Sequence, residues 1–450
     1  MKNTLKELYI QGFVNQTWLE RYGVPVKEST KMLIWSFIVS VLSLGAWLGS
    51  IHSGSLPVVY GRKKALLINN VVAMIAALLM VLSRTAKSFE MILLGRFLFG
   101  YNTGLGLSVH LMYLGESSPR EQRGFMTLTS SIFIGLGKVF GAVVGIRELM
   151  GTDDMWPYAL ALSGIPAALQ FLALLWFPEA PRYTYIDRGD EEGCKKDLRW
   201  LWGDNDLKLE LEDMAQERSS MQGQKAKTVC DVLRSRSVRW QLFALLLPCA
   251  GVNFSGITAL YFYAFDIFRQ AGVPGDQIQY LSIGSLLIDR AGRKKLMGIG
   301  YVLMGLTMSL LTVTLYFKDY YPWVPYFNIS LIFSVICIYG SGPAGVSMTL
   351  PADLFLQAWR PSAYVLSGTV CWVSLFLVGM LFPYIVDNLK ELCFLIFVVY
   401  CFLSGAFMLY YIPETKGKTM VEIMEDFSKL NFRAQESSAE TKDFALATKL

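Results

Sequence analysis

Basic and acidic side chains come together at a few points of this chain, each time near the end of a long apolar run. Glu116 is followed by Arg123, and Glu179 by Arg182. Arginine and carboxylate groups form directional pairs of hydrogen bonds, so these residues are suited to holding helix ends together. The expected cytoplasmic charge network consists of Arg62, Arg96, Glu116, Arg123, Glu179, Arg182, Asp289, Arg293, Asp353, Arg360 and Glu414.

The charged positions recur in the second half of the chain. Gly61-Arg62-Lys63 recurs at 292–294 and Pro178-Glu179 at 413–414, both about 235 residues further on. Repeated halves are typical of transporters that open alternately to the two sides of a membrane, which predicts that the ion pairs act as a gate. Positive charge that orients the helices, together with helix capping, would explain the same residues without a gate.

The composition indicates a membrane protein. Of the 450 residues, 53% are hydrophobic and only 17% are charged, where roughly 25% is usual for soluble domains. The apolar residues form runs of about 20, the length that a helix needs to cross a bilayer. We therefore predict an all-α polytopic protein. The runs are 32–57, 64–83, 89–113, 125–145, 156–177, 240–265, 296–317, 324–349, 362–386 and 392–412.

Basic loops orient these runs, because lysine and arginine favour the cytoplasmic side. The roughly 12 residues from Gln279 to Arg290 would have to cross the membrane, but as a helix they rise only about 18 Å. We therefore expect a twelve-span design that lacks its first and eighth spans. The predicted divisions are an extracellular segment at 1–31, an N-terminal bundle at 32–178, a cytoplasmic linker with short helices at 179–239, a C-terminal bundle at 240–412 and a cytoplasmic tail at 413–450.

The chain offers little for metal or covalent chemistry. It has seven cysteines without CxxC spacing and two histidines, so we expect no metal, no cofactor and no enzymatic activity. The net charge of +5 lies in short loops and does not indicate nucleic acid. Asn15-Gln16-Thr17 is a glycosylation motif, and it agrees with an extracellular N-terminal segment.

Six motifs carry a resemblance to a known family. The chain resembles the facilitative hexose transporters of solute carrier family 2, in the sugar-porter branch of the major facilitator superfamily, and most of all its fructose-type class. The motifs are Tyr-Gly-Arg-Lys (60–63), Gly-Arg-Phe-Leu-Phe-Gly (95–100), Tyr-Leu-Gly-Glu-Ser-Ser-Pro-Arg-Glu-Gln-Arg-Gly (113–124), Pro-Glu-Ala-Pro-Arg (178–182), Asp-Arg-Ala-Gly-Arg-Lys (289–294) and Pro-Glu-Thr-Lys-Gly-Lys-Thr (413–419).

The resemblance implies a solute site near the middle of the membrane, between two pseudo-repeated helical bundles. It implies that Asn253 and Thr258 contact a sugar and that Trp372 stacks on it. Sugars are bound by polar groups that reach their hydroxyls and by an apolar wall for the ring. The same resemblance implies a gate made of Phe262, Tyr263, Gly342 and Pro343.

The sequence departs from the family pattern at this site. Positions where the family carries amides or a tryptophan hold other residues here, namely Ala142, Val252, Thr258, Met348 and Cys371. Each lost amide removes a hydrogen bond worth about 0.5–1.5 kcal/mol. In the first-half loop, Val58 stands where the family has an acidic residue or Asn.

The leading functional prediction is facilitated diffusion of a hexose, fructose or glucose, by a multi-pass protein of the plasma membrane. Two alternatives stay open: a transport-incompetent truncated form, and a carrier of a non-sugar organic solute, which Lys138 inside a predicted span would favour. Glycines at four-residue spacing, Gly45/Gly49 and Gly137/Gly141, predict closely packed helices.

Overall fold

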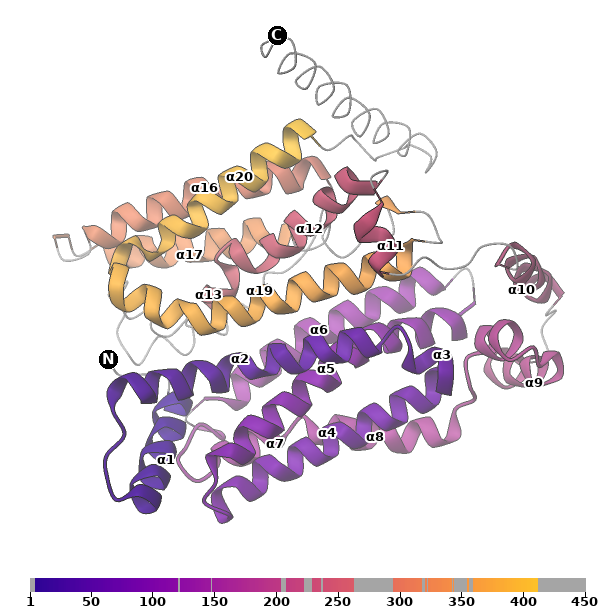
Figure 1. Cartoon of the computed structure of the whole chain (residues 1–450), viewed down its shortest axis with the longest axis horizontal. Coiled ribbons are helices and arrows are strands. Elements are labelled where there is room, and N and C mark those ends of the chain that lie inside the picture. Colours follow the sequence, from indigo (N-terminus) through magenta and orange to yellow (C-terminus); the bar gives the residue numbers. More distant parts are fainter. Residues whose placement is uncertain are drawn as a thin grey trace, which may run out of the picture. The chain divides into compact units, whose positions relative to one another are not determined.

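The chain is helical throughout the part that the structure describes, and no strand occurs there (Figure 1). The computed structural model describes residues 5–119, 122–146, 148–203, 208–221, 229–235, 238–262, 294–317, 320–321, 323–341, 343, 354–355 and 359–411. The all-α prediction is confirmed. The expected loss of an eighth span falls on 263–293, outside the described residues.

Each of the ten predicted apolar runs overlaps a helix or a pair of consecutive helices. The helices are α1 (Leu5–Tyr22), α2 (Glu28–His52), α3 (Leu56–Tyr60), α4 (Arg62–Thr85), α5 (Phe89–Ser117), α6 (Arg123–Val144), α7 (Trp156–Ala161), α8 (Gly164–Trp176), α9 (Glu191–Trp202), α10 (Lys208–Met221), α11 (Val229–Arg234), α12 (Arg239–Phe254), α13 (Ile257–Phe262), α16 (Lys294–Tyr316), α17 (Val324–Ser341), α19 (Arg360–Leu389) and α20 (Phe394–Tyr411). A π-helical turn covers Tyr183–Asp187, and a 3-10 turn covers Lys390–Cys393.

Six helical stretches of the described part are long and apolar enough to cross a membrane. They are Glu28–His52, Arg62–Thr85, Trp156–Trp176, Arg239–Leu260, Met297–Tyr316 and Ser362–Leu389. Two shorter apolar helices cover Tyr326–Gly340 and Phe394–Tyr410. The chain is therefore a multi-pass helical membrane protein.

The chain forms two compact units, which we describe separately. The first unit consists of Met1–Gln224, Ala259–Leu287 and Trp372–Lys390, and the second of Lys225–Thr258, Ile288–Cys371 and Glu391–Leu450. The predicted domain boundaries remain predictions.

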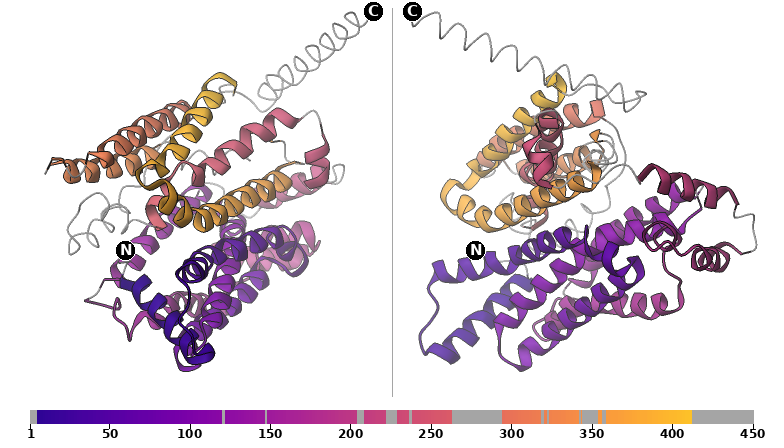
Figure 2. Two further views of the ribbon diagram at one scale, coloured as in Figure 1. Left: turned by 60° about the vertical axis from the view of Figure 1, so that its left-hand side comes forward. Right: turned by 45° about the vertical axis from the view of Figure 1, so that its right-hand side comes forward.

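In the first unit, α2 and α5 lie side by side along much of their length (Figures 1 and 2). Gly45 of α2 faces the backbone carbonyl of Phe97, and Gly100 of α5 faces that of Leu42. A methyl group at either glycine would overlap the opposite backbone, so these positions require glycine. Among the described residues nothing lies within 4 Å of a Cβ atom placed on Gly137 or Gly141, so the described part of the chain shows no close packing at that pair.

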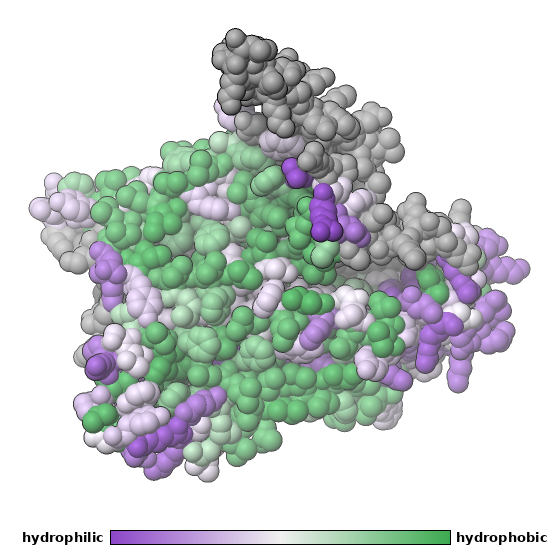
Figure 3. Space-filling model, in the orientation of Figure 1, coloured by the Kyte–Doolittle hydropathy of each residue, from purple (hydrophilic) through white to green (hydrophobic). Residues whose placement is uncertain are grey.

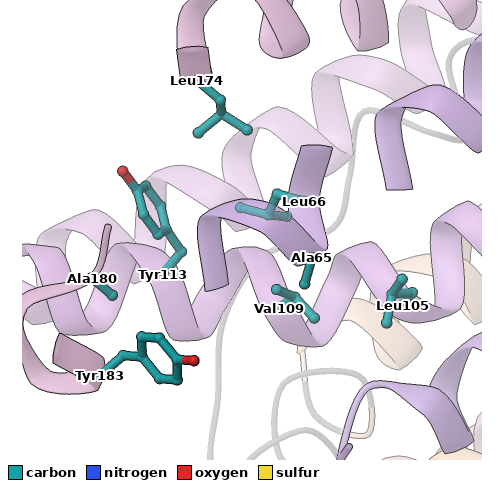
Figure 4. Close-up of a cluster of buried hydrophobic side chains, with 8 residues drawn as sticks. All are labelled: Ala65, Leu66, Leu105, Val109, Tyr113, Leu174, Ala180 and Tyr183. Carbon is teal, nitrogen blue, oxygen red and sulfur yellow. The ribbon is translucent and has the colours of Figure 1, made fainter. Parts of the chain in front are cut away.

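A buried apolar cluster joins α4, α5 and α8 to the chain that follows them (Figure 4). Leu66, Val109 and Leu174 lie in it together with Tyr183 of the π-helical turn. The hydroxyl of Tyr113, another member, donates to the carbonyl of Pro178 at 2.8 Å. The cluster thus fixes the start of the linker against the ends of α4 and α5.

The helix α1 lies in the segment predicted to precede the first span. Its Ile10 and Val14 are buried among residues of α2, α4, α5 and α7, and Phe13 lies 5.6 Å from Trp156 between ring centroids. Its last turn is tied to the start of α5 and the turn before it: Lys87 pairs with Glu20 at 2.8 Å, and Arg21 pairs with Glu90. This pairing lowers the pKa of the exposed Glu20 carboxyl, mainly through the Lys87 hydrogen bond.

In the second unit, α12 carries Pro248 in its interior and ends at Phe254. Gly256, at φ +87°, connects it to α13, and a side chain there would meet Met308 and Phe397. Two tyrosine hydroxyls reach the backbone of α12: Tyr400 donates to the Leu247 carbonyl at 2.6 Å and Tyr301 to the Pro248 carbonyl at 3.3 Å.

Apolar side chains cover the visible surface of the long helices, while hydrophilic side chains gather over α9 and α10 (Figure 3). These two helices enclose a small core of Cys194, Leu198 and Met214. Burial raises the pKa of the Cys194 thiol to about 12, and the nearby Asp197 adds to the shift. The thiol is therefore protonated and inert at neutral pH.

Candidate functional site

Arg62 is the centre of a charge cluster in the first unit. It is the first residue of α4, directly after Gly61 at φ +96°. Its Nη1 atom lies 2.6 Å from Asp187 Oδ2, and its Nε atom lies 3.0 Å from Glu116 Oε2. The guanidinium also lies 4.7 Å from the ring centroid of Tyr183. The side chain is 12% exposed, so these contacts are shielded from water, which strengthens them.

Glu179 caps the start of α4. Its Oε1 atom accepts hydrogen bonds from the backbone N–H of Lys63 at 2.8 Å and of Ala180 at 3.0 Å. The first N–H groups of a helix lack partners inside the helix, and a carboxylate there is favoured by the helix dipole. Glu179 therefore fixes the linker to α4 through contacts with the backbone.

The linker helices are attached to the same region. Arg182 Nη2 lies 3.2 Å from Glu210 Oε1 of α10, and Trp202 of α9 donates its indole N–H to the Ser117 carbonyl at 3.0 Å. Asp197 accepts a hydrogen bond from the Thr184 hydroxyl at 3.1 Å. Burial, helped by Glu179 and Asp190, raises the pKa of Asp197, although Thr184 acts in the opposite direction.

The structure brings only some of the predicted charge network together. Arg62, Glu116, Glu179 and Arg182 lie in this region, with Asp187 and Glu210 as partners that the sequence did not point to. Several predicted members fall outside the described residues or have side chains that are not described: Arg123, Asp289, Arg293, Asp353, Arg360 and Glu414.

Arg96 does not belong to this cluster. It lies near the start of α5, whereas Glu116 lies in the last turn of the same helix. Twenty residues of α-helix rise about 30 Å, so the two side chains stand at opposite ends. Arg96 was included in the expected network because of its residue type, and its place along α5 separates it from Glu116.

A second cluster, in the second unit, contains three of the residues implied to contact a sugar. The Asn253 Nδ2 atom donates to the Cys371 carbonyl at 2.8 Å and lies 3.7 Å from the Cys371 Sγ atom. The Thr258 hydroxyl donates to Asn253 Oδ1 at 2.8 Å. Asn253 is 3% exposed and Thr258 is 6% exposed. Residues far apart in the sequence thus meet through one side-chain amide.

The other residues implied by the resemblance are less fully placed. Val252 and Trp372 are half-buried, and Pro343 is buried. Lys138 is exposed on α6, and Asn15 is half-buried on α1. The structure does not describe Tyr263, Gly342 and Met348, or the side chains of Ala142 and Phe262. Among the described residues no group of histidines, cysteines and carboxylates could hold a metal ion.

Sequence reasoning missed the contacts that surround this cluster. The Cys401 thiol lies 3.8 Å from the Ser255 carbonyl, and Tyr301 and Tyr400 bond the backbone five and six residues before Asn253. Pro248 gave no signal for these contacts, because a proline inside a helix frees the carbonyl four residues earlier, that of Ala244, and not those of Leu247 and Pro248.

Comparison with known proteins covers nearly the whole chain. The family model described as "Sugar (and other) transporter" matches residues 8–427. The chain is 41% identical to human solute carrier family 2, facilitated glucose transporter member 11, with 95% of this chain and 89% of the relative covered. It is 38% identical to mouse member 9, covering 94% and 81%, and 38% identical to sheep member 5, covering 94% and 87%.

Solved structures agree with this assignment at the level of the fold. The inward-open xylose transporter XylE from E. coli superimposes with a TM-score of 0.71 at 20% identity, covering 93% of this chain and 97% of that one. The family model over residues 8–427 and the 38–41% identity to several members of solute carrier family 2 lead to one conclusion. This chain belongs to the sugar transporter family and is a member of the facilitated glucose transporter group within it.

Proposed function

We propose that this protein carries a hexose, fructose or glucose, across the plasma membrane by facilitated diffusion. The observation that carries the proposal is the 41% identity to a facilitated glucose transporter over 95% of the chain. The solute would bind in turn from either side, with no covalent step and no nucleotide. A protein of this kind is a carrier and not an enzyme.

The second-unit cluster supplies groups suited to a sugar. The amide of Asn253 and the hydroxyl of Thr258 can donate and accept hydrogen bonds, as the hydroxyls of a sugar require. Trp372, which follows Cys371 in α19 but belongs to the first unit, is assigned its stacking role through the resemblance alone. We assign these residues, with Val252, to the solute site. Ala142 and Met348 belong to the same proposal through the resemblance alone.

The first-unit cluster around Arg62 is assigned to gating. Its three-way pairing with Glu116 and Asp187 is strong enough to hold α4, α5 and the linker as one body. We propose that this body lies on the cytoplasmic side and takes part in the gate through its charged side chains. Phe262, Tyr263, Gly342 and Pro343 are the proposed gate on the opposite side.

Uniport is favoured over proton coupling by the charges of the first unit. Between Glu90 and Glu116, α5 contains no carboxylate, and α2 and α4 contain none beyond Glu28. A membrane-buried acid is the usual proton carrier in coupled transporters. These helices therefore offer no obvious proton carrier.

The test is uptake of labelled fructose and glucose by vesicles that contain the purified full chain. Saturable uptake of one hexose, competed by the unlabelled sugar and independent of a pH gradient, is the expected result. An Arg62→Gln variant is expected to reach the membrane but to transport several times more slowly. Absence of hexose uptake by correctly folded protein would overturn the proposal.

A second candidate is a carrier of a non-sugar organic solute, and the Asn253 cluster is the observation that favours it. The amide is already engaged with Thr258 and Cys371, and neighbouring positions lack the amides that the family pattern has there. Competition of the vesicle uptake by organic acids separates this candidate from the first. A transport-incompetent form would move neither class of solute.

A further inference from the structure

An exposed aromatic patch marks the end of α8. The apolar stretch Trp156–Trp176 is long enough to cross a membrane, and few residues of α8 are buried. At its end, Trp176 is 82% exposed and Phe177 is 43% exposed. The ring of Trp200, from α9 and itself 54% exposed, lies 5.1 Å from the ring of Phe177 between centroids. We call these three side chains the aromatic patch.

The aromatic patch lies at the depth of the lipid headgroups. A helix of membrane length ends where hydrocarbon gives way to headgroups, and tryptophan rings concentrate at that boundary. Because Trp200 contacts Phe177, α9 lies beside the membrane surface at this depth. The start of α4 lies there too, since Lys63 Nζ donates to the Leu175 carbonyl at 3.3 Å, and the next residue, Lys64, is an exposed cation.

The helix α9 carries cations on the face opposite to its core. Cys194 and Leu198, four residues apart, form the buried face. Lys196, Arg199 and Trp200 are all exposed. At about 100° of rotation per residue, these three positions lie on the other side of the helix. The two cations therefore share a face with one ring of the aromatic patch.

The charge of this face is not neutralised by the acidic residues of α9. Glu191 and Glu192, in the first turn, pair with Lys195 at 2.8 Å and 3.6 Å. In the part of the chain that the structure describes, neither Lys196 nor Arg199 lies in an ion pair. The face thus combines unpaired positive charge with aromatic rings at the end of a lipid-facing helix.

We propose that this surface binds the headgroup of an anionic phospholipid in the leaflet around the end of α8. Lys196 and Arg199 donate to the phosphate and to the further anionic group of the headgroup, and Lys64 adds to the positive field. The rings of Trp176 and Trp200 stand at the level of the glycerol, and the acyl chains lie along the exposed side of α8. The lipid thereby attaches α9 to the membrane. The inference does not depend on which solute the protein carries.

Quenching of tryptophan fluorescence by brominated lipids tests the proposal. The full chain is placed in phosphatidylcholine vesicles that contain a small share of either phosphatidylserine or phosphatidylcholine with brominated acyl chains. Brominated phosphatidylserine is expected to quench more strongly, and Trp176→Phe together with Trp200→Phe should remove the excess. Lys196→Gln together with Arg199→Gln should make the two lipids equal, because each lost cation weakens binding by about fivefold.

The matched control is Lys195→Gln, which removes a paired cation of the same helix and should keep the excess quenching. Unchanged melting temperatures in detergent show that the variants fold. Equal quenching by both lipids in the unaltered chain would overturn the proposal, and so would an excess that survives either double variant. Loss of the excess on adding water-soluble glycerophosphoserine would also overturn it, by assigning the surface to a free phosphate ester. A chain that carries no hexose can still show the lipid preference, so the two proposals fail separately.

Discussion

The guanidinium of Arg62 pairs with two carboxylates and contacts an aromatic ring in the first unit. Its planar fork donates in several directions at once, which an ammonium group cannot do. Glu116 and Asp187 come from different parts of the chain, so this side chain joins the linker to both α4 and α5, together with the Glu179 cap and the Tyr113 hydrogen bond.

Replacing Arg62 by lysine is therefore expected to lower stability although the charge is kept. The bidentate contacts would be lost from a site only 12% exposed, at a cost of about 1–3 kcal/mol. Thermal unfolding in detergent, followed by tryptophan fluorescence, would record the change. Arg84→Lys is the control, because Arg84 is 40% exposed and pairs with Asp153 and Asp154 near water; its effect should stay below about 0.5 kcal/mol. Equal losses would contradict the assigned role.

Asp197 predicts a pH dependence of the linker. Burial raises its pKa above the ordinary value of 3.8, so the folded form binds a proton more tightly than the unfolded form does. The stability that this proton adds is full below pH 3.8 and is lost as the pH rises through the raised folded value. Hydrogen exchange in α9 should therefore slow as the pH falls from neutral towards 4, after correction for the intrinsic exchange rate.

The control for this effect is Asp197→Asn, which keeps an acceptor for the Thr184 hydroxyl but cannot ionise. At neutral pH, α9 of this variant should exchange its backbone hydrogens as slowly as α9 of the unaltered protein does at acidic pH. A pH dependence that persists unchanged in this variant would assign the effect to other groups.

Residue types revealed part of these sites. Arg62, Glu116 and Glu179 could be predicted from the sequence because arginine and carboxylate groups at the ends of apolar runs are suited to pairing with each other. Asp187 could not, since it lies among several similar charges of the linker. The contact between Asn253 and Cys371 joins positions 118 residues apart, and no local pattern predicts which amide will meet which carbonyl.

At the scale of helices, close packing of α2 on α5 depends on particular glycines. Gly100→Ala would place a methyl group against the Leu42 backbone, and such overpacking costs about 1–3 kcal/mol. A lower melting temperature and less folded protein after extraction into detergent are expected. Gly137→Ala is the matched control, because open space surrounds that position, and its melting temperature should stay the same or rise. Similar losses in both variants would refute the packing argument.

Hydropathy found the long helices but not α1. Apolar runs of membrane length are recognisable because a helix needs about 20 apolar residues to cross the bilayer. The buried residues of α1, Ile10 and Val14, lie four residues apart in a helix that also carries many polar residues, so it resembles an ordinary polar segment in the sequence. Its fold depends on the cluster that includes Trp156, far along the chain, and on charged partners such as Lys87.

For the molecule as a whole, the proposed orientation can be tested at Asn15, which is half-buried on α1. The pattern Asn-x-Ser also occurs at Asn253 and Asn328, but these residues are 3% and 0% exposed inside α12 and α17. Glycosidase treatment of the protein made in cells should therefore increase its electrophoretic mobility. Asn15→Gln should abolish this increase, while Asn328→Gln should leave it unchanged. A glycan that survives Asn15→Gln would reverse the proposed orientation or place the modification elsewhere.

The whole-molecule architecture was the most predictable part. Two similar halves could be recognised because charged motifs recur at one offset, and the family comparison agrees with that design. The repeated motifs did not predict the limits of the two compact units. Their limits lie inside α13 and α19, where no change in composition marks them.

Pro248 also affects how far the second unit can bend. A proline in mid-helix leaves the carbonyl of Ala244 without its usual donor and weakens the helix there. The hydroxyls of Tyr301 and Tyr400 bond the Pro248 and Leu247 carbonyls, which attaches α12 to α16 and α20. We expect this attachment to stiffen the weakened stretch, so that bending of α12 is resisted at the residue where its own backbone bonding is poorest.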